Sequence, residues 1–233
     1  MSKRSDIIDG KDAANSLYGL VYTEVLGWID LGHAQGMDIR ILMSKINYGE
    51  SSSQEHYTVA YSQSMVDPWG LLKVGKLTKW RIKRGRSYQE RRSIALAMMM
   101  TVARKFESLQ SSFPTKLITD SGFSGEDLVS DLLGFYRVMS LPNPFSFIRP
   151  VSQSEALKRW DYYGPIGAIK NDSFQPILFP DQEKFPRAKP FKGQLPNFMR
   201  TIRPYDDFRS GNVAIATRDG SFIDKAQGGT LDL

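Results

Sequence analysis

The residues whose types best fit acid–base chemistry are Asp30, His33, Glu107 and Glu126. His33 is one of only 2 histidines in the chain, and it follows closely after Asp30. A histidine beside a carboxylate can act as an oriented general base or supply metal ligands. Because the chain contains no cysteine, thiolate nucleophiles, thiolate metal sites and disulfides are excluded.

Glu107 ends an apolar stripe that runs through Leu96, Met100 and Ala103 at helical spacing. A carboxylate in that position would be shielded from solvent, which favours its protonated form and suits a general acid. The competing interpretation is a solvated glutamate in a fraying last turn, since charged side chains are rarely buried.

Glu126 and Asp127 follow Ser124 at the start of an expected helix. Acidic residues there complement the helix macrodipole, and Asp127 can close a capping box with Ser124. A rigid helix start is also a good place from which to direct a carboxylate into a cleft. The catalytic candidates are therefore Glu126, Glu107, His33 and Asp30, and the substrate-binding candidates are Ser124, Asp127 and Trp28.

No motif names a reaction outright. With 2 histidines and no His-Glu-x-x-His, the sequence argues against a histidine-rich zinc site. It has no Gly-x-Ser-x-Gly elbow either, so a serine hydrolase is poorly supported. We expect no organic cofactor, while a divalent metal bound by His33, Glu107 and Glu126 remains open.

These residues must be positioned by helices and strands. The sequence pattern predicts an α+β fold with a central buried helix pair and a small antiparallel sheet. Ser87 and Glu90 form a capping box before the apolar run at 94–103, which predicts a buried helix at 88–109. Its partner is expected at 124–139, and another helix at 33–46. Alternating residues predict strands at 57–61 and 72–82, and a late hairpin at 213–223. Turns are expected at 68–70 and 120–123.

We expect one domain over residues 1–233, with a core at about 13–164 and an irregular, proline-rich wrapping segment at 165–233. The tail from 226 is expected to be loose. The longest apolar run, from Ile94 to Met100, is too short for a bilayer span of about 20 residues. The N-terminus has no apolar h-region, so we expect a soluble protein with no Sec signal peptide.

The net charge of +6 favours anionic partners such as nucleic acid, a phospholipid surface or an acidic cell-wall polymer. Basic residues are concentrated between Lys73 and Arg92, around Trp80. This segment could bind nucleic acid through phosphate contacts and stacking. We favour the alternative, a solvated strand face that protects a sheet edge.

Two longer motifs carry a resemblance. They are Gly19-Leu-Val-Tyr-Thr23 with Gly27-Trp-Ile-Asp-Leu-Gly-His33, and Phe123-Ser-Gly-Glu-Asp-Leu-Val-Ser-Asp-Leu-Leu-Gly134. They resemble the motifs Gly-Leu-Val-Tyr-Thr … Gly-Phe-Ile-Asp-x-x-His and Phe-Ser-Pro-Glu-Asp-Leu-Tyr-Ser-Asn-Leu-Leu-Gly. Those motifs belong to an uncharacterised family, a domain of unknown function in Gram-negative bacterial envelope proteins, many of them predicted lipoproteins.

The resemblance implies that five residues converge on one site: Asp30, His33, Glu107, Glu126 and Asp127. The chain departs from the family pattern at three places. Phe106 replaces a histidine, Asp131 replaces an asparagine, and the Arg-Asp that follows the family histidine is displaced to around Asp38. The first departure removes a potential ligand of a family-like metal site.

Together these patterns predict a hydrolase of an anionic cell-envelope polymer, with peptidoglycan as the substrate and glycosidic cleavage by Glu126 and Glu107. Such a protein could be an antibacterial effector that reaches the periplasm by leaderless secretion, with a secretion-system component or an immunity protein as partner; a cytoplasmic location is the alternative. The other two hypotheses are a metal-dependent hydrolase and a non-enzymatic basic module. That module would bind an envelope partner or, less favoured, nucleic acid.

Overall fold

The computed structural model describes residues 2–66, 71–111, 124–217 and 219–225. These residues adopt an α+β fold, as predicted. The chain divides into two compact units: unit 1 is Met1–Met37 with Phe123–Thr201, and unit 2 is Asp38–Gly122 with Ile202–Leu233. The expectation of one domain, with a core at about 13–164 and a wrapping segment at 165–233, stays a prediction. The expected turns at 68–70 and 120–123 and the tail from 226 lie outside the described residues.

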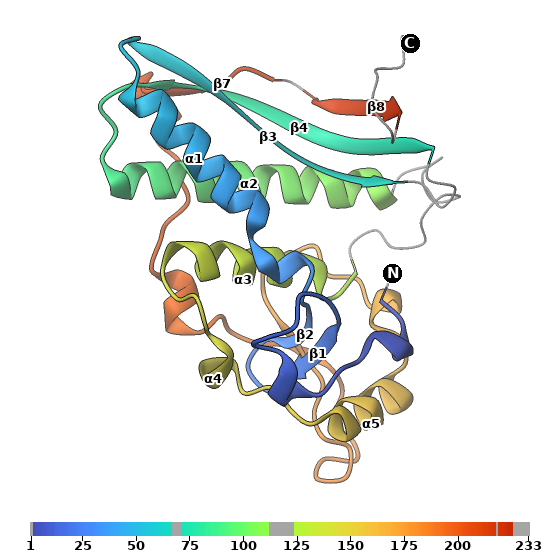
Figure 1. Cartoon of the computed structure of the whole chain (residues 1–233). Coiled ribbons are helices and arrows are strands. Elements are labelled where there is room, and N and C mark those ends of the chain that lie inside the picture. The colour runs from blue at the N-terminus through green and yellow to red at the C-terminus, as the bar shows by residue number, and fades with distance from the viewer. Residues whose placement is uncertain (1, 67–70, 112–123, 218, 226–233) are drawn as a thin grey trace. The chain divides into compact units, whose positions relative to one another are not determined.

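Unit 1 is built on a small mixed sheet with the strand order β1-β2-β5-β6. β1 (Leu20–Thr23) and β2 (Gly27–Asp30) are antiparallel, β2 and β5 (Ile177–Leu178) are parallel, and β5 and β6 (Phe191–Lys192) are antiparallel. Its helices are α3 (Asp127–Met139), α4 (Phe145–Ile148) and α5 (Gln153–Tyr163) (Figure 1). Short 3-10 helices complete it: η1 (Arg4–Asp6), η2 (Gly10–Asp12), η3 (His33–Gln35), η5 (Ile166–Ala168) and η6 (Asn197–Arg200).

Aromatic side chains form the core between the unit 1 sheet and α5. Trp28 is 2% exposed, and its ring packs edge-on against Tyr22 and Trp160, with centroids 5.3 and 5.6 Å away. Edge-to-face pairs of this kind add to the stabilisation from buried area. Trp28 was predicted as a substrate contact, but its position is that of a core residue.

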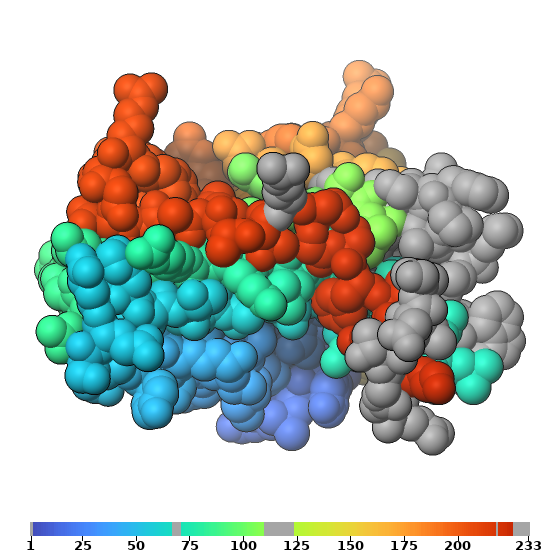
Figure 2. Space-filling view, turned by 90° about the horizontal axis from the view of Figure 1, so that it is seen from above, coloured from blue at the N-terminus to red at the C-terminus, as the bar shows by residue number. Residues whose placement is uncertain are grey.

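Unit 2 is an antiparallel sheet with α1 (Met37–Ser51) and α2 (Tyr88–Ser111) on one face (Figure 1). β3 (His56–Val66) and β4 (Leu72–Lys83) form a long ribbon, and β7 (Val213–Ile215) and β8 (Ser221–Lys225) both pair with the other edge of β4. η7 (Phe208–Ser210) precedes β7. Val59 and Trp80 face each other on the buried side of the ribbon. Figure 2 views the opposite, outer side.

α2 is the buried helix of unit 2. Glu90 accepts a hydrogen bond from the Ser87 amide at 2.8 Å, and the Glu90 amide donates to the Ser87 hydroxyl at 3.2 Å, which confirms the predicted capping box. Ile94 and Met98 are fully buried, as the all-round apolar run predicted. The other predicted central helix, α3, belongs to unit 1.

The predicted hairpin at 213–223 is wrong, because β7 and β8 pair with β4 and not with each other. The Leu77 amide donates to the Gly220 carbonyl at 2.7 Å. Gly220 has φ +73°, and a Cβ there would come within 1.8 Å of the Leu77 carbonyl oxygen. The chain therefore follows the edge of β4 where a turn was expected.

None of the helices among the described residues is long and apolar enough to cross a membrane.

Candidate functional site

His33 and Asp131 form a hydrogen-bonded pair in unit 1. Nδ1 of His33 lies 3.0 Å from Oδ1 of Asp131. The Asp131 side chain is 10% exposed and the His33 side chain 40% exposed. Asp131 therefore holds one side of the imidazole, while part of the ring remains open to a ligand.

Two glycines bring the backbone that carries His33 against the helix that carries Asp131. Gly36, just after η3, has φ +65°, and a Cβ there would lie 2.3 Å from the Gly134 carbonyl oxygen. A Cβ on Gly134 would lie 2.8 Å from the His33 carbonyl oxygen. Real Cβ atoms do not approach so closely, so this contact of η3 with α3 requires glycine at both positions.

Asp30 fixes the turn between β2 and η3. Its Oδ1 accepts hydrogen bonds from the Gly32 amide at 2.7 Å and the His33 amide at 3.3 Å. The Asp30 amide donates to the hydroxyl of Ser130 at 3.0 Å, and that hydroxyl donates to the Glu126 carbonyl at 2.7 Å. Ser130, which is fully buried, thereby joins β2 to the first turn of α3.

The surroundings of His33 are acidic. Burial lowers the pKa of His33, but the hydrogen bond and charge of Asp131 raise it, as do the charges of Asp127 and Asp30. Together they place the pKa well above its ordinary value of 6.5. The raised pKa favours the cationic form of the imidazole, and a cationic imidazole can donate a proton.

Glu126 is a buried carboxylate, 1% exposed, immediately before α3. Its Oε1 accepts a hydrogen bond from the Ser2 hydroxyl at 2.7 Å, and its Oε2 accepts one from the buried Ser124 hydroxyl. The predicted capping box between Ser124 and Asp127 is wrong, because the Asp127 amide donates to the Ser124 backbone carbonyl at 3.3 Å and not to its hydroxyl. The helix begins at Asp127 without a side-chain cap. Glu126 anchors the segment that carries Asp127, Ser130 and Asp131.

Glu107 lies in α2, and its side chain is 3% exposed. The interpretation as a solvated glutamate in a fraying turn is therefore wrong. We predicted that Glu107 lies in one site with Asp30, His33 and Glu126. Those residues belong to unit 1 and Glu107 to unit 2, so this stays a prediction. Within unit 1 lie the remaining predicted site residues: Trp28, Asp30, His33, Ser124, Glu126 and Asp127.

Over the residues that the structure describes, no three side chains of histidine, aspartate or glutamate are grouped so that they could hold a metal ion. The metal-dependent alternative rests on His33, Glu107 and Glu126, which are divided between the two units. It stays a prediction.

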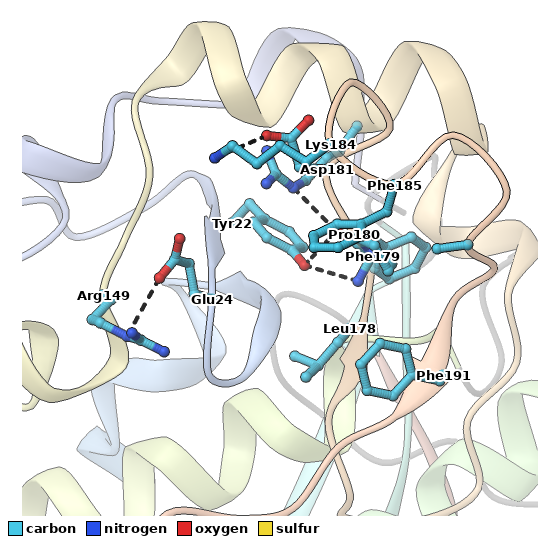
Figure 3. Close-up of a pocket in the computed structure, with 12 residues that line it drawn as sticks. Tyr22, Glu24, Arg149, Leu178, Phe179, Pro180, Asp181, Lys184, Phe185 and Phe191 are labelled. Carbon is cyan, nitrogen blue, oxygen red and sulfur yellow. Dashed lines mark hydrogen bonds and ion pairs between the residues drawn. The ribbon is translucent and has the colours of Figure 1, made fainter.

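Two features of unit 1 do not follow from the predictions made on the sequence. The first is the role of Asp131, although Asp127 and Asp131 lie one helical turn apart on a helix that starts near the motif. The second is a pocket of about 490 Å³ in unit 1 (Figure 3). Phe179, Phe185 and Phe191 line it, and each is adjacent to a proline in the segment that was expected to be an irregular wrap. That spacing of aromatic residues was the available signal.

No protein-family model matches the chain, and neither a curated protein nor a solved structure matches it.

Proposed function

We propose that the protein is a hydrolase of an anionic cell-envelope polymer, with peptidoglycan as its substrate and His33 as its proton donor. The observation that carries the proposal is the pair in which Asp131 holds Nδ1 of a partly exposed His33, whose pKa is raised by that contact. An imidazole oriented by a carboxylate is a recurrent arrangement for general acid–base catalysis.

The reaction is a hydrolysis in which water attacks the scissile bond while the leaving atom takes a proton from Nε2 of His33. A carboxylate must accept the proton that the water loses, and the charges of Asp30 and Asp127 both reach the imidazole. Asp30 and Asp127 are therefore the two candidates for this role, and Oδ1 of Asp30 also accepts two backbone amides. Transfer of that proton back to His33 restores the site.

This assignment differs from the predicted pair of Glu126 and Glu107. Glu126 is 1% exposed and accepts hydrogen bonds from two hydroxyls, which supports an anchoring role. Glu107 belongs to unit 2, and a contribution to the same reaction stays a prediction.

The charge of the protein supports an anionic polymer as substrate. The net charge is +6, and β4 exposes Lys73, Lys79, Arg81 and Lys83 along one side of the ribbon. The likeness of the two motifs to an envelope family supports peptidoglycan in particular. A role as a secreted effector, with periplasmic action and an immunity protein as partner, is part of the same proposal.

The experiment is digestion of purified peptidoglycan sacculi, read by the release of soluble muropeptides. The wild type should release them, His33→Gln should not, and His56→Gln should behave as the wild type. His56 is a matched control because it is the other histidine of the chain, in β3 of unit 2. Intact sacculi across a range of pH, with and without divalent metals, would contradict the proposal.

The outer side of the β3–β4 ribbon favours a second candidate, binding of nucleic acid. Opposite Arg81 and Lys79 of β4 lie the small residues Thr58 and Ala60 of β3, which leave room for a polymer backbone. Contacts of lysine and arginine with phosphates make affinity fall steeply with salt. Arg81→Gln should then weaken binding of single-stranded DNA and lower the salt slope by about one. Arg40→Gln, an exposed arginine on α1, should not.

A further inference from the structure

The pocket of unit 1 is a candidate ligand site that the proposed chemistry does not use. Its volume of about 490 Å³ lies within the range of roughly 300–1,000 Å³ of small-molecule sites. Residues from four separate segments line it, among them Tyr22, Arg149, Phe179 and Phe191. Figure 3 shows Glu24 and Arg149 on one side of it, apart from Phe179, Phe185 and Phe191.

The inner polar groups of the pocket already have partners. The Tyr22 hydroxyl donates to the Phe179 carbonyl and accepts from the Phe179 amide, both at 2.8 Å. The guanidinium of Arg159 donates to the same carbonyl at 3.1 Å and lies over the Tyr22 ring. Because these groups are satisfied, what the inner part offers to a ligand is mainly ring surface.

The rim carries two ion pairs, one with both side chains at least half exposed and one in which the aspartate is 11% exposed. Arg149 lies 3.4 Å from Glu24, and Lys184 lies 3.3 Å from Asp181. Among the described residues, Arg149 is the one non-glycine residue with positive φ, at 53°. Backbone strain of this kind persists where the surrounding structure holds a residue in place.

The aromatic inner surface and the charged rim together determine which kind of ligand fits the pocket. A purely apolar ligand would cover the rim and leave its charged groups without water, which costs free energy. A ligand with hydroxyl groups can donate to Glu24 and accept from Arg149 and Lys184. Balanced ion pairs do not favour a ligand of either charge.

Phe185 and Phe191 are 59% and 53% exposed beside this rim. The face of an aromatic ring is electronegative, so it attracts the C–H groups on the flat side of a sugar ring. An acetamido methyl group can enter the apolar inner part, while the sugar hydroxyls remain at the rim.

We propose that this pocket binds an N-acetylated sugar ring at the end or side of a glycan. The choice of an N-acetylated sugar over a plain one rests on the proposed function, whereas the choice of a sugar rests on the pocket itself.

The test is calorimetric titration of the full chain with triacetylchitotriose, with cellotriose as the sugar that lacks acetamido groups. Triacetylchitotriose should bind, and Phe191→Ala should weaken it about tenfold, the effect of one lost ring contact. Glu24→Gln should weaken it as well, because the amide keeps the shape and removes the charge. Phe147→Ala is the matched control, since Phe147 is 60% exposed in unit 1 and lies outside the pocket lining.

Three results would overturn the proposal: no binding of triacetylchitotriose, equal binding of cellotriose, or equal loss in Phe147→Ala. Binding of the aromatic dye anilinonaphthalene sulfonate without binding of the sugar would also overturn it, in favour of an aromatic ligand. His33→Gln should bind the sugar as the wild type does. The failure of hydrolysis and the failure of sugar binding are therefore separate results.

Discussion

The hydroxyl of Ser130 accepts a hydrogen bond from the backbone amide of Asp30, which lies 100 residues earlier in the chain. The same hydroxyl donates to the carbonyl of Glu126, one turn back along α3. One buried hydroxyl thus sets the position of β2 against the helix that carries Asp131. The geometry of the histidine pair depends on this contact because His33 follows Asp30 directly through a short turn.

Ser130→Ala should lower the free energy of unfolding by about 1–3 kcal/mol, because the Asp30 amide loses its acceptor. Urea denaturation measures the loss. Ser140→Ala is the control: the Ser140 hydroxyl is at the exposed end of the same helix and makes one 3.3 Å contact with the Tyr136 carbonyl. Equal losses in the two variants would contradict a special role for Ser130.

Asp131→Asn should lower the pKa of His33 toward its ordinary value of 6.5, because it removes the nearest negative charge. A proton-detected NMR titration of the imidazole measures the shift. Asp207→Asn, an exposed aspartate of unit 2, should leave the titration unchanged.

Linkage gives the same pair a pH signature in stability. The pKa of His33 is raised in the folded state, so the protonated imidazole adds to the free energy of unfolding. This stabilisation is fully present below about pH 6.5 and is lost as the pH rises through the raised pKa. The free energy of unfolding of the wild type should therefore fall over that window, and Asp131→Asn should fall less. The opposite order, with the variant falling more steeply, would show that Asp131 does not stabilise the imidazolium.

Gly134→Ala sets two effects against each other. Alanine is favoured over glycine in a helix interior by about 1 kcal/mol, yet its Cβ would lie 2.8 Å from the His33 carbonyl oxygen. We expect the clash to prevail and to move η3 away from α3, so that both stability and the His33 pKa fall. Urea denaturation and NMR titration of the same variant test this. A more stable protein with an unchanged pKa would show that η3 moves without cost.

Met98→Asp should prevent unit 2 from folding, because Met98 is fully buried and an unpaired charge there costs several kcal/mol. Met98→Leu keeps the volume and should lose less than about 1.5 kcal/mol. Circular dichroism and thermal unfolding compare the two. Native spectra and an unchanged melting temperature for Met98→Asp would place the helix at the surface.

The sequence predicted best what is decided locally. The start of α2 is determined by Ser87, Glu90 and the apolar run after them, all within a few turns. The start of α3 was predicted too early. Ser124 has the residue type of an N-cap, but its hydroxyl donates to the Glu126 carboxylate, and the helix begins at Asp127. β7 and β8 pair with a strand far away in the chain, so a nearby glycine turn suggested the wrong partner.

The candidate site was predicted only in part for the same reason. Asp30, His33 and Glu126 were chosen by residue type, and all three have specific hydrogen-bond partners in unit 1. Asp131 lies 98 residues from His33, and the pattern of a single sequence does not reveal such a pair. The pocket was missed because its lining comes from separate segments, one of them without regular periodicity.

Each unit is made of two stretches of chain, and the stretches alternate along the sequence. During synthesis, unit 1 therefore lacks α3 until Met139 has left the ribosome, and it lacks β5 and β6, half of its sheet, until Lys192 has followed. The sheet of unit 2 waits still longer for the strands that cover the edge of β4, an exposed edge that invites pairing between nascent chains. No single cut releases either unit whole, so each would have to be expressed by joining its two stretches through a linker.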